Sequence, residues 1–172
     1  ALASASVADI YVWESFTDAG GGINSPTGGN GSGSPSVVVV DGSPIVAGSG
    51  NLYAPGGSFT CHLYGAGFVS NPTMEIANLG TSFDTSSFYL NTPTGPVYPT
   101  VEVTSGGSGF GAFNTYNLSW DYAGAAIFFN FGSSGAHASL DRLTIGTFGE
   151  ALPAPGALAL LGLAGLGRRR RS

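Results

Sequence analysis

The sequence predicts an all-β protein: an antiparallel β-sandwich of jelly-roll-like type, followed by a short C-terminal apolar helix. Short segments rich in β-branched and aromatic residues recur along residues 9–150, separated by glycine, proline and asparagine. No stretch before residue 151 shows sustained helical periodicity. A closed barrel or a β-solenoid is the alternative, but no repeat of fixed period is present.

Each expected strand begins and ends at a change in composition. Residues 19–35 are rich in glycine and proline and are expected to form a loop, and the Gly/Ser-rich residues 104–111 a linker. Asp41-Gly42 is a hairpin-type turn signal, which predicts that 36–40 pairs with 44–47. The expected strands are 9–13, 36–40, 44–47, 51–54, 58–64, 74–79, 87–91, 97–103, 113–122, 125–131 and 138–145.

The clearest strand signal lies in the last third of the chain. Tyr116, Leu118, Trp120 and Tyr122 alternate with polar residues, the period of two that is typical of a half-buried antiparallel strand. The more apolar segment 125–131 is expected to be more central and to pair with it. In 138–145 the apolar phase slips between Leu140 and Leu143, which predicts a β-bulge near Asp141.

Charge excludes some classes of partner. Residues 1–150 carry ten acidic side chains against one arginine, a formal charge of −9, and the chain has no lysine. Such a surface repels nucleic acid and anionic membranes. It suits cations, neutral glycans or simple solubility, and composition does not rank these three.

Candidate catalytic residues are present, but no spacing organises them. The acids Glu75, Glu102, Asp121 and Asp141 could supply the two carboxylates of a glycoside hydrolase, yet nothing in the sequence selects a pair. The histidines His62 and His137 fit no metal-ligand spacing with each other or with the cysteine. We therefore expect no enzymatic activity, no metal centre and no cofactor.

Cys61 is the one cysteine of the chain, so no internal disulfide is expected. It shares a strand face with Phe59 and Leu63, which predicts a buried, inert thiol. A catalytic Cys61–His62 pair is disfavoured because adjacent strand residues point to opposite faces.

Two kinds of ligand contact remain candidates. A Ca²⁺ ion could use Asp18 beside the glycine-rich loop, or Asp121 with Asp141 on neighbouring strands. Asp141 is better explained as a local turn or bulge partner, paired with Arg142 or with a backbone N–H. Exposed aromatic rings near loops could stack on sugars. The candidates are Tyr53, Tyr64, Tyr89 and Tyr98.

The last 22 residues, 151–172, form a separate unit. An uncharged segment from 151 to 167 contains two prolines, and only its part after Pro155 can form regular helix. The 11 residues 157–167 would extend about 16 Å as a helix, roughly half of the hydrocarbon core. The residues of this expected membrane segment are Ala157, Leu158, Leu160, Leu161, Leu163 and Leu166. The arginines that follow, which would stay on the cytoplasmic side, are Arg168, Arg169, Arg170 and Arg171.

This order of parts resembles the PEP-CTERM sorting signal of Gram-negative bacteria that produce exopolysaccharide. The motif residues are Pro153, Ala154, Pro155 and Gly156, with Ala154 standing where glutamate is usual. The resemblance is confined to 151–172 and implies recognition by an exosortase-type processing enzyme after transient anchoring in the inner membrane. A sortase motif is the rival reading, but Pro155 occupies the position that requires threonine. A nucleic-acid or acidic-lipid patch and a packed amphipathic helix are weaker rivals.

We therefore expect three parts: a signal-peptide remnant or disordered N-terminus (1–8), a β-sandwich domain (9–150) and a C-terminal sorting signal (151–172). Small residues at signal-peptidase spacing in 1–8 are the basis for the first. The expected function is that of an exported, non-enzymatic cell-surface or extracellular-matrix protein with a structural or adhesive role. A carbohydrate-binding module for matrix polysaccharide and a secreted hydrolase are the rivals. Exposed aromatics in a line would favour the module, and two carboxylates facing each other across a cleft would favour the hydrolase.

Overall fold

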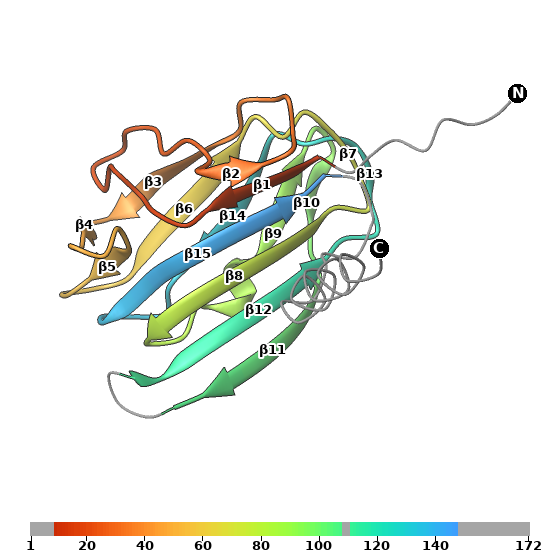
Figure 1. The fold of residues 1–172 in the computed structure, drawn as a ribbon. Coiled ribbons are helices and arrows are strands. Elements are labelled where there is room, and N and C mark those ends of the chain that lie inside the picture. Colours follow the sequence, from red (N-terminus) through yellow and green to blue (C-terminus); the bar gives the residue numbers. More distant parts are fainter. Residues whose placement is uncertain (1–8, 108–110, 148–172) are drawn as a thin grey trace, which may run out of the picture.

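Two antiparallel sheets face each other in the computed structural model, which describes residues 9–107 and 111–147 (Figure 1). The eight-stranded sheet has the order β11 (Thr100–Gly106), β12 (Phe113–Ser119), β8 (Thr73–Gly80), β15 (Ala138–Gly146), β1 (Ile10–Trp13) and β2 (Gly28–Gly29). Two further strands, β5 (Leu52–Ala54) and β4 (Ile45–Val46), continue this sheet from the first residues of β15.

The facing sheet has five strands. Their order is β10 (Gly95–Val97), β9 (Tyr89–Thr92), β14 (Phe128–Gly132), β6 (Phe59–Tyr64) and β3 (Ser36–Gly42). A separate two-stranded sheet joins β13 (Ala123–Ala125) to β7 (Phe68–Ser70), and one 3-10 turn, η1, covers Thr85–Ser87. The described residues contain no α-helix, so the all-β prediction is confirmed for them.

The core lies between the two sheets and follows the alternation in the sequence. Tyr116 and Leu118 of β12 are buried, as the period of two predicted. Trp120, which follows β12, packs edge to face on Phe129 of β14, with ring centroids 5.1 Å apart. Burying each such large apolar side chain stabilises the fold by about 1.5–3 kcal/mol, which makes this interior the main source of stability.

The predicted bulge is present. The pairing of β15 with β8 shifts register between Leu140 and Arg142, so Asp141 is the extra residue. The bulge lets both Leu140 and Leu143 reach the core, where each is completely buried. It thereby accounts for the phase slip in the sequence.

The predicted pairing of the strand 113–122 with the segment 125–131 is wrong. β12 pairs with β8 and β11, whereas β14 lies in the other sheet between β6 and β9. The strand also ends at Ser119, three residues earlier than expected, because the chain then crosses between the sheets. Apolar content correctly indicated that β14 is central, but it does not say in which sheet.

The hairpin expected at Asp41-Gly42 is also wrong. Asp41 and Gly42 continue β3, opposite Thr60 and Phe59 of β6, with a register shift after Val39. β4 pairs with β5 instead. Gly42 has φ of +88° and its missing Cβ leaves room for the Ser58 carbonyl, so glycine is required here by a close strand contact rather than by a two-residue turn.

Two expected irregular segments contain strands. Within 19–35, Gly28–Gly29 pairs with β1, and within 104–111 the first three residues complete β11. The expected N-terminal remnant (1–8) and sorting signal (151–172), including its helix, lie outside the described residues. Among residues 9–107 and 111–147, none forms a helix that is long and apolar enough to cross a membrane.

Candidate functional site

Aromatic side chains line the outer face of the five-stranded sheet. Inward neighbours on the same strands, Leu63, Leu90 and Phe129, are completely buried, so alternate residues must point outward. These outward rings come from β9, β14 and β6, and Tyr98 follows β10. We call this set the aromatic row; its members are Tyr98, Tyr89, Phe128, Tyr64 and His62.

The rings of the aromatic row form a continuous chain of contacts. Tyr98 and Tyr89 have ring centroids 6.2 Å apart and planes inclined by 58°. Tyr89 and Phe128 follow at 6.2 Å and 61°, and Phe128 and Tyr64 at 5.7 Å and 60°. Strand pairing sets this order. Phe128 lies opposite Tyr64 of β6 on one side and opposite Asn91 of β9 on the other, and Tyr89 is on the same face of β9 as Asn91.

His62 supports the row from within. Its ring stacks on Phe128 at 3.9 Å and 11°, and its Nδ1 hydrogen-bonds the Tyr64 hydroxyl at 2.8 Å. Burial lowers the pKa of His62 below its usual 6.5, against a smaller opposing effect of a hydrogen bond with Asn130. The imidazole is therefore uncharged at neutral pH, and its parallel stack covers one face of Phe128.

Exposure and charge set this face apart. Tyr98 is 65% exposed, and the other members of the row are half-buried. None of β6, β9, β10 and β14 contains an acidic or basic residue apart from the neutral His62, and the edge strand β3 adds one exposed acid, Asp41. The row therefore exposes apolar aromatic rings, with the tyrosine hydroxyls, the His62 imidazole and amide groups between them.

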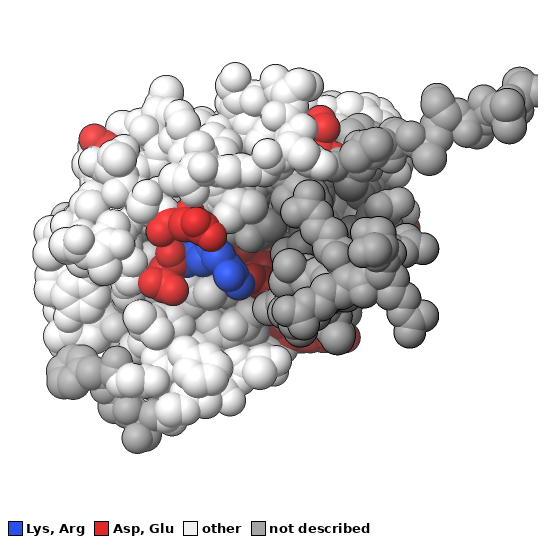
Figure 2. All heavy atoms as spheres, viewed as in Figure 1, with Lys and Arg blue, Asp and Glu red and all other residues white. Residues whose placement is uncertain are grey.

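Charged groups gather instead on the outer face of the eight-stranded sheet. Figure 2 shows basic and acidic side chains side by side there. Arg142 of β15 forms an ion pair with Glu75 of β8, whose side chain is only 12% exposed. Glu75 therefore occupies Arg142, which the sequence predicts as a possible partner of Asp141.

The other candidate carboxylates are dispersed. β12 and β15 flank β8 rather than each other. Asp121 follows Ser119, which lies opposite Thr73 at the start of β8, whereas Asp141 is the bulge residue next to Leu140, which lies opposite Asn78 towards the other end. The predicted Ca²⁺ pair of Asp121 and Asp141 is therefore not brought together. Glu102 lies on the edge strand β11. No group of three or more potential metal ligands occurs among the residues that the structure describes.

Asp18 shapes its own loop. Its Oδ1 accepts hydrogen bonds from the backbone N–H groups of Gly20 and Gly22, at 2.8 Å and 2.7 Å. Tyr11 plays a similar part further along, since its hydroxyl accepts a hydrogen bond from the Gly33 amide beside an open hollow of about 330 Å³. Asp18 therefore stabilises the turn of its own loop, and Tyr11 holds the glycine-rich segment against β1.

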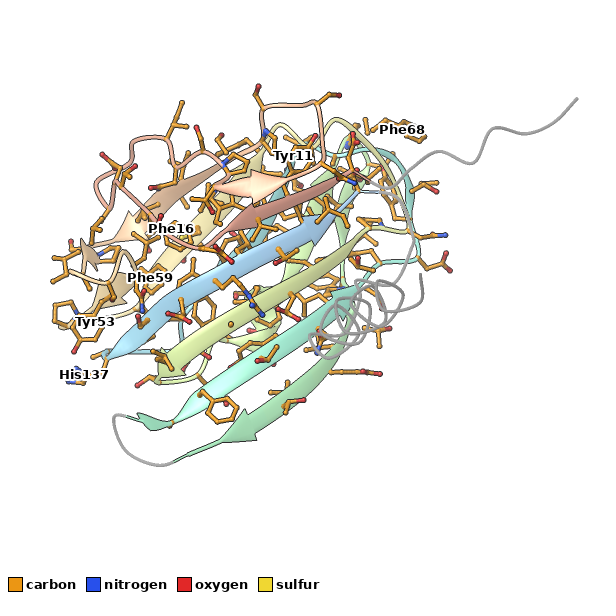
Figure 3. All side chains as sticks on the ribbon, in the orientation of Figure 1. Tyr11, Phe16, Tyr53, Phe59, Phe68 and His137 are labelled. Carbon is orange, nitrogen blue, oxygen red and sulfur yellow. The ribbon has the colours of Figure 1, made fainter. Side chains whose placement is uncertain are left out.

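Cys61 is completely buried and faces the core with Phe59 and Leu63, as predicted. Burial raises the pKa of its thiol, and His62 points to the opposite face of the strand, so the two do not form a nucleophile–base pair. His137 has no part in this region. It lies at one end of the eight-stranded sheet, where its Nδ1 and the Tyr53 hydroxyl are 2.8 Å apart (Figure 3).

Three of the four tyrosines proposed for sugar stacking therefore share one face, and Tyr53 does not. Sequence reasoning missed Phe128 and His62. The signal for Phe128 is faint, because it sits in the run Phe128-Phe129-Asn130-Phe131, where only sheet geometry separates the outward ring from the inward ones. For His62, alternation placed it opposite Cys61 but did not reveal its aromatic neighbours.

Comparisons with known proteins do not identify the chain: no family model, no curated protein and no solved structure matches it.

Proposed function

We propose that this chain is an exported, non-enzymatic cell-surface or extracellular-matrix protein whose adhesive role is to bind matrix polysaccharide. The observation that carries the binding part is the aromatic row on the outer face of the five-stranded sheet. Sugar rings present apolar C–H faces that pack on aromatic rings, while their hydroxyls pair with amide and phenol groups at the edge. The strand order of the two sheets supports a jelly-roll-like arrangement of this module.

The distribution of carboxylates supports a binding role over a hydrolytic one. Glycoside hydrolysis uses two carboxyl groups about 5–10 Å apart on either side of the scissile bond. Here Glu75 is paired with Arg142, and Asp121 and Asp141 lie near opposite ends of β8. The aromatic row itself has no carboxylate on its strands.

Export and sorting are the second part of the proposal. The resemblance of 151–172 to a PEP-CTERM signal supports recognition by an exosortase-type enzyme and transient residence in the inner membrane. The low content of charged residues, 9%, and the absence of lysine are in keeping with a secreted β protein. An apolar segment that is too short to span the membrane, followed by four arginines, favours temporary retention in the inner membrane over durable anchoring.

The binding proposal is tested by affinity electrophoresis of the purified full chain in gels that contain matrix polysaccharides. Retardation is expected for the native chain and should be reduced in Tyr98→Ala, which removes the most exposed ring of the row. The matched control is Phe113→Ala, because Phe113 is 44% exposed but lies on the eight-stranded sheet. Equal mobility of all three proteins in gels with and without polysaccharide would reject glycan binding.

A further inference from the structure

We propose that the ligand of the aromatic row is a single, uncharged polysaccharide chain, bound along its length rather than at its end. This inference rests on the proposed glycan binding and adds the class of glycan. It follows from the tilt of the rings, the absence of lysine and arginine on the strands that carry them, and the length of the row.

The tilt of the rings argues against a flat ligand. Successive planes are inclined by 58°, 61° and 60°, so no two neighbouring members of Tyr98, Tyr89, Phe128 and Tyr64 present coplanar faces. A crystalline polysaccharide surface would need coplanar rings to contact several at once. An isolated chain can rotate about its glycosidic bonds, so each sugar can meet a differently inclined ring.

The environment of the row argues against an anionic glycan. The strands that carry it contain no lysine or arginine to pair with a carboxylate or sulfate. Arg142 is the one basic residue in residues 1–150, and it pairs with Glu75 on the other sheet. An anionic ligand would also be repelled by the formal charge of −9 on residues 1–150, and its desolvation would go uncompensated.

The length of the row calls for several sugars. Its rings cross from β9 through β14 to β6, two strand spacings or about 10 Å, and Tyr98 extends it by a further ring contact. The rings follow one another at similar spacing, 5.7–6.2 Å, so a repeating ligand can use them all. Affinity should therefore rise with oligosaccharide length until the chain covers the row.

The test compares polysaccharides that differ in charge and in whether they are soluble chains or a crystalline solid. The full chain is titrated by calorimetry with soluble β-glucan and galactomannan, both neutral, and with alginate, a uronic-acid polymer; sedimentation with microcrystalline cellulose measures adsorption to a crystalline surface. We expect binding to a soluble neutral polymer, increasing affinity from di- to hexasaccharide, and weak or no binding to alginate and crystalline cellulose. Tyr89→Ala and Tyr98→Ala should each weaken binding about tenfold, equivalent to about 1.4 kcal/mol.

Phe113→Ala should bind like the native chain, and a thermal melt of each variant checks that the fold is retained. Tighter binding to alginate, preference for crystalline cellulose, or equal affinity for a disaccharide and the polymer would overturn this inference and leave glycan binding in place. Absence of binding to every polymer, or equal losses in the Phe113 and Tyr98 variants, would overturn the proposed function as well.

Discussion

His62 and Phe128 lie face to face across β6 and β14, with ring centroids 3.9 Å apart and planes within 11° of parallel. The stack partly buries the imidazole at the sheet surface and leaves one face of the Phe128 ring for other contacts. Through this contact, a change in the protonation of His62 acts directly on the aromatic row. Acid is therefore expected to act on this face of the molecule through His62.

The stability of the fold should decrease as the pH falls through the range in which His62 titrates. Burial lowers the pKa of His62 in the folded chain below the 6.5 of the unfolded chain, so the unfolded state takes up the proton first. The free energy of unfolding should be highest above about pH 7.5, fall below pH 6.5 and level off below the folded-state pKa. Urea unfolding between pH 8 and 5 measures this effect.

The matched control for that measurement is His62→Gln, which keeps a polar side chain but cannot titrate. The difference in unfolding free energy between the native chain and this variant should shrink as the pH falls from 8 to 5. A difference that stays constant over this range would show that His62 does not link stability to pH.

Cys61 should react slowly with thiol reagents in the native protein. The thiol is completely buried and burial raises its pKa, so both access and the thiolate fraction are low. Labelling with a thiol-specific chromophore should be slow without denaturant and stoichiometric in concentrated urea. Rapid stoichiometric labelling of the folded chain would contradict the position of Cys61 in the core.

Asn24→Ala should destabilise the fold by about 1–3 kcal/mol, because two part-buried backbone donors lose the acceptor that the buried Asn24 side chain supplies. Asn24 Oδ1 accepts hydrogen bonds from the N–H groups of Thr17 and Asp18, at 2.7 Å and 2.9 Å. The neighbouring Ile23, 67% exposed, provides the control, and Ile23→Ala should change stability by less than about 0.5 kcal/mol. Chemical denaturation of both variants compares them, and similar small effects would reject the anchoring role of Asn24.

Gly80→Ala should lower the free energy of unfolding by at least about 1 kcal/mol. Gly80 has a left-handed backbone conformation and lies close to the backbone of His137. Gly80 has φ of +74°, and a Cβ there would lie 2.2 Å from the His137 carbonyl oxygen. Gly48→Ala is the control, because nothing lies within 4 Å of its Cβ position and its φ is not positive. Thermal unfolding should show a lower midpoint for the first variant only.

Protein recovered from the cell surface should lack Arg168 to Arg171, because the proposed sorting signal is cut near Pro153–Gly156. Intact mass spectrometry of the surface fraction measures this directly. Replacing all four arginines with glutamine should weaken retention in the inner membrane and release uncleaved precursor. A surface protein that carries the complete tail would argue for a permanent anchor or a packed helix.

The all-β class and the inward faces of the main strands follow from local patterns in the sequence. Tyr116 and Leu118 alternate with polar residues, and Phe59, Cys61 and Leu63 alternate with Thr60 and His62. A pleated strand must place such alternate residues on one face, and all five apolar ones are buried. The bulge at Asp141 was also predictable, since a slip in apolar phase requires an extra residue if both flanking leucines are to reach the core. These features depend on neighbours along the chain.

Strand pairing and the neighbours on the outer faces depend on long-range packing. Asp41-Gly42 continues β3 because β6 offers it a longer ladder than a two-residue turn could, and β14 joins the other sheet from β12. The aromatic row unites Tyr64 and Phe128, 64 positions apart, through one cross-strand register. The local sequence pattern does not specify such a register, because every strand with a period of two has an apolar face that could be buried. The register is set only when the strands pack together around the core.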